Sequence, residues 1–105
     1  MALYMLMGKY SPEAIKAIFE EGSDREAAAR KLVEAVGGKL HGFYGMFGQE
    51  YHVAAIIETP GTAEYIGGII PTVLSGTLAD VKTIALFTAA DMMKATKIAK
   101  KARAA

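Results

Sequence analysis

The chain has 105 residues, which is the size of one domain and leaves no room for two independently folded ones. Hydrophobic residues make up 52% of the sequence and charged residues 22%, with a formal net charge of +1, so part of the apolar excess is expected to face a partner. Because there are no cysteines, disulfides, cysteine zinc sites, iron–sulfur clusters and thiol catalysis are excluded, and a cytoplasmic location is favoured. A compact domain of this mass exposes about 5,700 Å².

The first third of the chain predicts a strand followed by two short helices. Residues 2–8 are uncharged in both alternating sets, as in a strand with two buried faces. The Ser-Pro-Glu segment at 11–13 is a helix start, and Gly22 ends that helix. A capping box that begins at Ser23 then starts a second helix, which we expect to run to about Val36.

The middle of the chain predicts a β-hairpin. Residues 39–47 and 51–58 are rich in aromatic and β-branched side chains, and the loop between them contains a glycine. We therefore expect two antiparallel strands joined by a short turn at residues 48–50.

The last third predicts a helix, a strand and a final helix. Apolar residues recur at helical spacing over 65–74, but glycines and Pro71 within this segment predict a kinked or broken helix. Residues 80–87 alternate as a strand does, and Thr88 with Asp91 is a cap for a last helix.

The order β-α-β-β-α-β predicts an α+β, ferredoxin-like fold, with a four-stranded antiparallel sheet, helices on one face and an extra C-terminal helix. The other sheet face is then free of helices. Its side chains are apolar in the first strand and the hairpin, so a monomer would expose more apolar surface than soluble proteins usually tolerate. We expect this face to pack against a second copy, which makes the protein a homodimer or a higher homo-oligomer.

Several segments resemble a known family. They are Gly8 to Ile15, Lys31 to Leu40, Phe43 to Gly48, Ser75-Gly76 and Leu86-Phe87-Thr88. These segments are similar to the GYD domain family, over residues 1 to about 95, which leaves 96–105 as a basic, Ala/Lys-rich tail. The resemblance implies membership of the dimeric α+β barrel group and no assigned chemistry. The glycine–tyrosine–aspartate motif is altered, because His52 stands where the aspartate would be.

Candidate acid–base residues are His52, Tyr51 and His41. An imidazole titrates near pH 7 and a phenol can donate a hydrogen bond to a carbonyl or enolate. Successive strand residues point to opposite faces, so Tyr51 and His52 share a cavity only if a bulge intervenes. The two histidines are expected to lie about 13–17 Å apart at about 3.3 Å per residue, so within one subunit they are independent and no metal site is predicted.

Candidate ligand-binding residues are Tyr10, Tyr44 and Ser75, with Lys9 as a possible contact for an anion. A cleft is expected between the open sheet face or a strand edge and the third helix, where glycines and Pro71 remove side-chain bulk. The alternative is a third helix that is irregular and closely packed, with no cavity. We expect these residues to border the cleft: Tyr10, His41, Tyr44, Tyr51, His52 and Ser75.

Two functions remain open at this point. The first is an oligomeric module that binds a small, largely apolar ligand without catalysis. The second, by analogy with other dimeric α+β barrel proteins, is a cofactor-independent isomerase or monooxygenase that uses His/Tyr acid–base chemistry. No cofactor is predicted, because the glycine-rich stretch at 67–76 fits no nucleotide-binding motif. No membrane segment and no nucleic-acid partner are expected, and five basic residues in the last twelve are read as a solvated tail.

Overall fold

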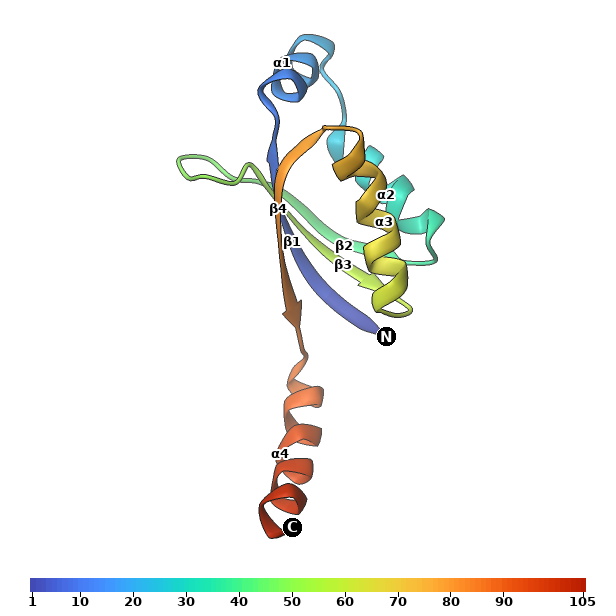
Figure 1. Cartoon of the computed structure of the whole chain (residues 1–105), viewed down its shortest axis with the longest axis vertical. Coiled ribbons are helices and arrows are strands. Elements are labelled where there is room, and N and C mark those ends of the chain that lie inside the picture. Colours follow the sequence, from blue (N-terminus) through green and yellow to red (C-terminus); the bar gives the residue numbers. More distant parts are fainter.

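The structure, a computed structural model that describes residues 1–105, has four strands and four helices (Figure 1). In chain order they are β1 (Ala2–Tyr10), α1 (Pro12–Glu21), α2 (Arg25–Ala35), β2 (Lys39–Gly45), β3 (Val53–Thr59), α3 (Thr62–Leu74), β4 (Leu78–Leu86) and α4 (Ala89–Ala104). Their order is the predicted one.

The strands form one antiparallel sheet in the order β2-β3-β1-β4. The long β1 is therefore central, between β3 and β4. Helices α2 and α3 lie side by side on one face of the sheet, α1 lies beyond its end, and α4 continues away from it after β4 (Figure 1). The predicted α+β, ferredoxin-like fold is confirmed.

Local capping explains where the first two helices begin and end. The Ser11 hydroxyl accepts a hydrogen bond from the Ala14 amide at 3.1 Å, and Gly22, with φ of 64°, ends α1 in the left-handed conformation. Helix α2 is capped one residue later than predicted. The Asp24 carboxylate, not the Ser23 hydroxyl, accepts from a first-turn amide, that of Ala27, at 3.0 Å.

The hairpin loop is longer than predicted. Strand β2 ends at Gly45 and β3 begins at Val53, so residues 46–52 connect the two strands. The Met46 amide donates to the His52 carbonyl at 2.7 Å, and the His52 amide donates to the Gly8 carbonyl of β1 at 2.9 Å. These backbone bonds hold both ends of the loop against the sheet.

Helix α3 is not broken at Pro71, which rules out the broken form of the predicted kinked or broken helix. It runs from Thr62 to Leu74 as one helix. A proline removes one backbone donor, which would have paired with the carbonyl of Gly67, four residues earlier. Gly67 is exposed, so water can reach the backbone at this point of the helix. The helix therefore tolerates the proline near its end.

The core lies between the sheet and helices α2 and α3. Its most buried apolar side chains are Val33, Leu40, Ala55, Ile57 and Tyr65. Strand register assigns the opposite side chains to the helix-free face: Leu3, Met5, Met7, Ile56, Ile84 and Leu86. No helix covers them (Figure 1).

The chain exposes far more surface than a compact domain of its size. Its accessible surface is 7203 Å² and its extents are 59 × 31 × 21 Å, whereas a compact monomer of this mass exposes about 5,700 Å². Two features account for the excess. One is the helix-free face, and the other is α4, which makes no substantial contact with the rest of the chain. The expected boundary between residues 95 and 96 falls inside this helix.

Candidate functional site

A cavity of about 110 Å³ lies between the sheet and the inner faces of α2 and α3. Most of its lining is apolar and comes from both layers. Representative lining side chains are Leu6, Phe43, Ala55, Ile57, Leu32 and Ile69. Gly68 of α3 contributes to the wall next to Val36, since a side chain there would stand 3.6 Å from a Val36 methyl group. The third helix thus borders a cavity rather than closing it, but the cavity lies on the helix-covered face of the sheet and not at the open face or a strand edge, where the cleft was expected.

Tyr65 closes the wall of the cavity where α3 begins. Its ring lies against Tyr4 with a centroid separation of 4.0 Å, and its hydroxyl shares a 2.8 Å hydrogen bond with the Thr83 hydroxyl. Burial raises the pKa of the Tyr65 phenol above 10.0, although the bond to Thr83 opposes this shift. Tyr65 is therefore a neutral, structural phenol at neutral pH.

Tyr10 and His52 form a second, more open hollow beside α1. The Tyr10 amide donates to His52 Nδ1 at 3.0 Å, and the two rings stack. Because a backbone amide can only donate, Nδ1 carries no proton and the neutral ring has its hydrogen on Nε2. The apolar side chains of Ile15, Ile18 and Phe19 complete this hollow. Tyr10 lines the main cavity as well, and His52 does not.

Tyr51 points away from His52. Its hydroxyl donates to Asp80 Oδ2 at 2.9 Å, and Lys82 Nζ stands 5.9 Å from the centre of its ring. The bond to the Asp80 carboxylate raises the pKa of the Tyr51 phenol above 10.0. Lys82 pairs with Met7 in the register of β4 and β1, which assigns it to the helix-free face.

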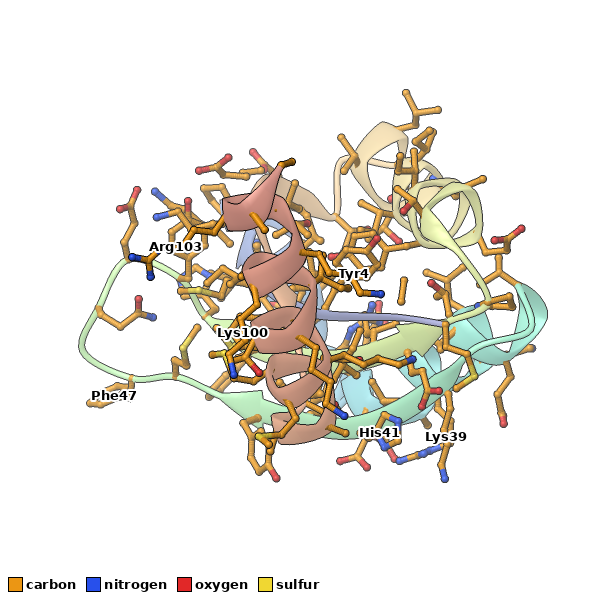
Figure 2. All side chains as sticks on the ribbon, turned by 90° about the horizontal axis from the view of Figure 1, so that it is seen from below. Tyr4, Lys39, His41, Phe47, Lys100 and Arg103 are labelled. Carbon is orange, nitrogen blue, oxygen red and sulfur yellow. The ribbon has the colours of Figure 1, made fainter.

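His41 lies at a bulge in the outer strand β2, where the register shifts between Leu40 and Gly42. Its Nε2 donates to Glu58 Oε1 at 2.6 Å. Figure 2 shows His41 beside Lys39, far along the hairpin from Phe47 at the loop. The two histidines have no common partner, and no three His, Asp or Glu side chains come together as a metal site would require.

The remaining candidates serve other roles. Tyr44 is 64% exposed on the outer strand. Ser75 follows α3, and its hydroxyl donates to the Thr72 carbonyl at 2.8 Å. Lys9 pairs in register with Asp80 on β4. Of the six residues expected to border the cleft, the cavity brings in Tyr10 and leaves out His41, Tyr44, Tyr51, His52 and Ser75.

Arg25 is a lining residue that sequence reasoning missed. It is the first residue of α2, and its side chain borders the cavity. The available signal was its position, because a cation is unfavourable at the positive end of the helix dipole. That Arg25 has no acidic partner could not be predicted, because the sequence does not give the distances between its guanidinium and the carboxylates of the chain.

The topology and the cavity define a ferredoxin-like α+β domain with a pocket between sheet and helices. The GYD domain family matches residues 4–96, and the chain belongs to that family. Among solved structures, the chain is similar to the solution structure of the C-terminal domain of the MgtC protein from Mycobacterium tuberculosis. The TM-score is 0.58 at 16% identity, over 82% of this chain and 88% of that one, which is a likeness of fold. No curated protein matches the chain.

Proposed function

We propose that this GYD domain protein binds a small, largely apolar molecule in the cavity between the sheet and helices α2 and α3. The observation that carries the proposal is the cavity itself, which is lined mainly by apolar side chains from both layers. Ligand sites are typically concave and apolar, with a few polar groups that fix orientation. Here Tyr10, Arg25 and Thr72 are such groups.

The three acid–base candidates, His41, Tyr51 and His52, each bond to a different partner, which favours a binding function over catalysis. His41 is bonded to Glu58, His52 to the Tyr10 amide and Tyr51 to Asp80, and none of these bonds joins two of the candidates. A general acid and base must reach the same substrate to act together. The alternative, a cofactor-independent isomerase or monooxygenase, would need a second subunit to bring these groups together.

A homo-oligomer that buries the helix-free face is part of this proposal. The accessible surface of 7203 Å² exceeds the compact-monomer value by about 1,500 Å², and a standard interface buries about 800 Å² per partner. At about 25 cal/mol per Å², burying about 800 Å² of apolar surface per subunit would favour association strongly, before the entropic costs of ordering the subunits are counted. The helix-free face offers the apolar side chains of Leu3, Met5, Met7, Ile56, Ile84 and Leu86 for this contact.

Helix α4 fits the same assembly. Residues 89–105 carry five basic side chains and one acidic one, whereas residues 1–88 carry seven basic and ten acidic ones. Met92, Met93 and Ile98 are exposed on this helix. Opposite net charge and exposed apolar side chains both support contact with the body of another copy. The proposal includes a cytoplasmic location and neither a nucleic-acid nor a membrane partner. No helix has the length and apolar character to span a bilayer.

Native mass spectrometry tests the binding function. The protein is purified gently from its own host, and we expect one small molecule retained per chain. Ala55 lines the cavity, so Ala55→Leu should fill it and abolish retention. Ala63→Leu, which adds the same side chain at an exposed position of α3 outside the cavity, is the matched control and should retain the ligand. Equal retention by both variants would place the ligand elsewhere.

Turnover assays separate the two functions. Under the binding proposal, His41→Ala and His52→Ala leave ligand affinity nearly unchanged, because neither side chain lines the cavity. The enzyme alternative instead requires one of these substitutions to abolish turnover of the retained molecule.

A further inference from the structure

One cationic side chain borders the cavity without a carboxylate partner. Arg25 donates from Nη1 to the Ser23 hydroxyl at 3.3 Å, and its Nε is buried and bonded to nothing. The ion pairs of the chain are Arg30–Glu26 and His41–Glu58, so Arg25 belongs to neither. A buried guanidinium donor with no acceptor costs free energy unless another group satisfies it.

The acidic residues next to Arg25 in sequence are already engaged. Asp24 caps α2 by accepting from the Ala27 amide at 3.0 Å, and Glu26 binds Arg30 at 2.7 Å. Arg25 is also the first residue of α2, where the helix dipole presents positive charge. The dipole and the guanidinium therefore both favour an anion at this end of the cavity.

The rest of the cavity limits that anion to one charge. Glu64 is the acidic residue in the lining. It lies in the first turn of α3, and because α2 and α3 run in opposite directions (Figure 1), it is at the other end from the start of α2. A second negative charge on the ligand would meet apolar side chains or Glu64. Near Arg25, the Thr72 and Thr77 side chains also line the cavity.

The volume of the cavity limits the size of the ligand's apolar part. An apolar cavity of about 150 Å³ holds a benzene molecule, so one of about 110 Å³ suits a body of about four or five carbons. Branched or compact shapes fit a cavity of this volume better than long chains do.

We propose that the ligand class is a small monocarboxylate with a compact apolar body, its carboxylate bound by Arg25 and its body held between the sheet and helices α2 and α3. This assignment rests on the proposed binding function and deepens it. A planar guanidinium matches a carboxylate in charge and hydrogen-bond geometry.

Paired probes test the assignment by isothermal titration of the full chain. The probes are 3-methylbutanoate and 3-methylbutanamide, which share an apolar body and differ in charge. We expect the acid to bind at least tenfold more tightly than the amide. Arg25→Gln should weaken acid binding about 10- to 100-fold and leave amide binding unchanged, because hydrogen bonds to charged groups are the stronger ones.

Lys31→Gln is the matched control. It removes a positive charge from the same helix at an exposed residue outside the cavity, and it should alter neither affinity. Unfolding curves of the unliganded variants show whether each is folded, and Arg25→Lys, which keeps the charge without the planar fork, should retain part of the preference for the acid.

Each outcome decides the proposal. Equal affinity for acid and amide, with both lost in Ala55→Leu, would overturn the carboxylate assignment and leave the binding function in place. Acid binding that survives Arg25→Gln would move the anion to another group and also overturn it. Binding of neither probe at millimolar concentration would reject this ligand class, whereas the retained molecule in the native mass spectrum tests the binding function separately.

Discussion

The rings of Tyr10 and His52 stack with 6.0 Å between their centroids and 6° between their planes, while the Tyr10 amide donates to His52 Nδ1 at 3.0 Å. The contact joins the last residue of β1 to the end of the hairpin loop, 42 residues later in the chain. It lies at the point where β1 turns into α1, so it holds the loop and the helix start in one arrangement.

We predict that His52→Ala destabilises the fold by about 1 kcal/mol, because the Tyr10 amide loses its acceptor. His52→Asn should recover part of the loss, since an amide oxygen can accept the same bond. Denaturant unfolding at one protein concentration measures both. His41→Ala, at an exposed bulge, is the control and should cost less than His52→Ala. An unchanged free energy of unfolding in His52→Ala would show that the Tyr10 bond contributes nothing.

Substitution by alanine should change the free energy of unfolding in opposite directions at Gly38 and at Gly67. A Cβ at Gly38 would stand 2.6 Å from the Glu58 carbonyl oxygen and 2.9 Å from a Val33 methyl group, so Gly38→Ala forces β3 or α2 to shift. We predict a loss of about 1–3 kcal/mol. Gly67 lies inside α3 with open space around it. Gly67→Ala should therefore gain up to about 1 kcal/mol of unfolding free energy through helix propensity. The same unfolding assay checks both, and a stabilising Gly38→Ala would contradict the register of β2 and β3.

The alkaline stability limit should depend on Tyr65. Burial raises its pKa in the folded state above 10.0, so the folded chain holds the phenolic proton more tightly than the unfolded chain does. This contribution to stability is fully present below pH 10, falls as pH rises from 10 through the folded pKa, and is constant above it. Unfolding free energies measured across that range should fall less steeply for Tyr65→Phe. Tyr44→Phe, at an exposed position, should keep the wild-type slope, and a wild-type slope in Tyr65→Phe would contradict the assignment.

Signals that act over a few residues were predictable from the sequence. Ser11 caps α1, and Thr88 and Asp91 form a reciprocal capping box at the start of α4, as predicted. Both depend only on neighbouring backbone amides. The helical path through Pro71 was not predictable in this way, since it depends on the exposure of Gly67, which is set by the packing of α3.

Features that depend on contacts between distant segments were mispredicted or missed. The loop begins at Met46 instead of Gly48, and the His52 amide bonds to the Gly8 carbonyl of β1, a partner far away in the sequence. The polar residues expected at the cleft were predicted from the chemistry of their side chains alone. Of these six residues, only Tyr10 lines the cavity. Arg25 was missed because an unpaired charge is recognised by which acidic groups are absent around it in space.

The oligomer proposal makes a prediction about two isoleucines. Ile84 lies on the helix-free face and is 38% exposed, and Ile66 lies on the outer side of α3 and is 50% exposed. Sedimentation velocity at micromolar concentration should show a dimer or larger species for the wild type. Ile84→Glu should convert it to monomer, because a carboxylate buried against apolar side chains without a partner is strongly unfavourable. Ile66→Glu makes the same change at a similarly exposed site and should keep the wild-type state. A wild-type monomer would reject the oligomer, and dissociation by Ile66→Glu alone would move the interface to α3.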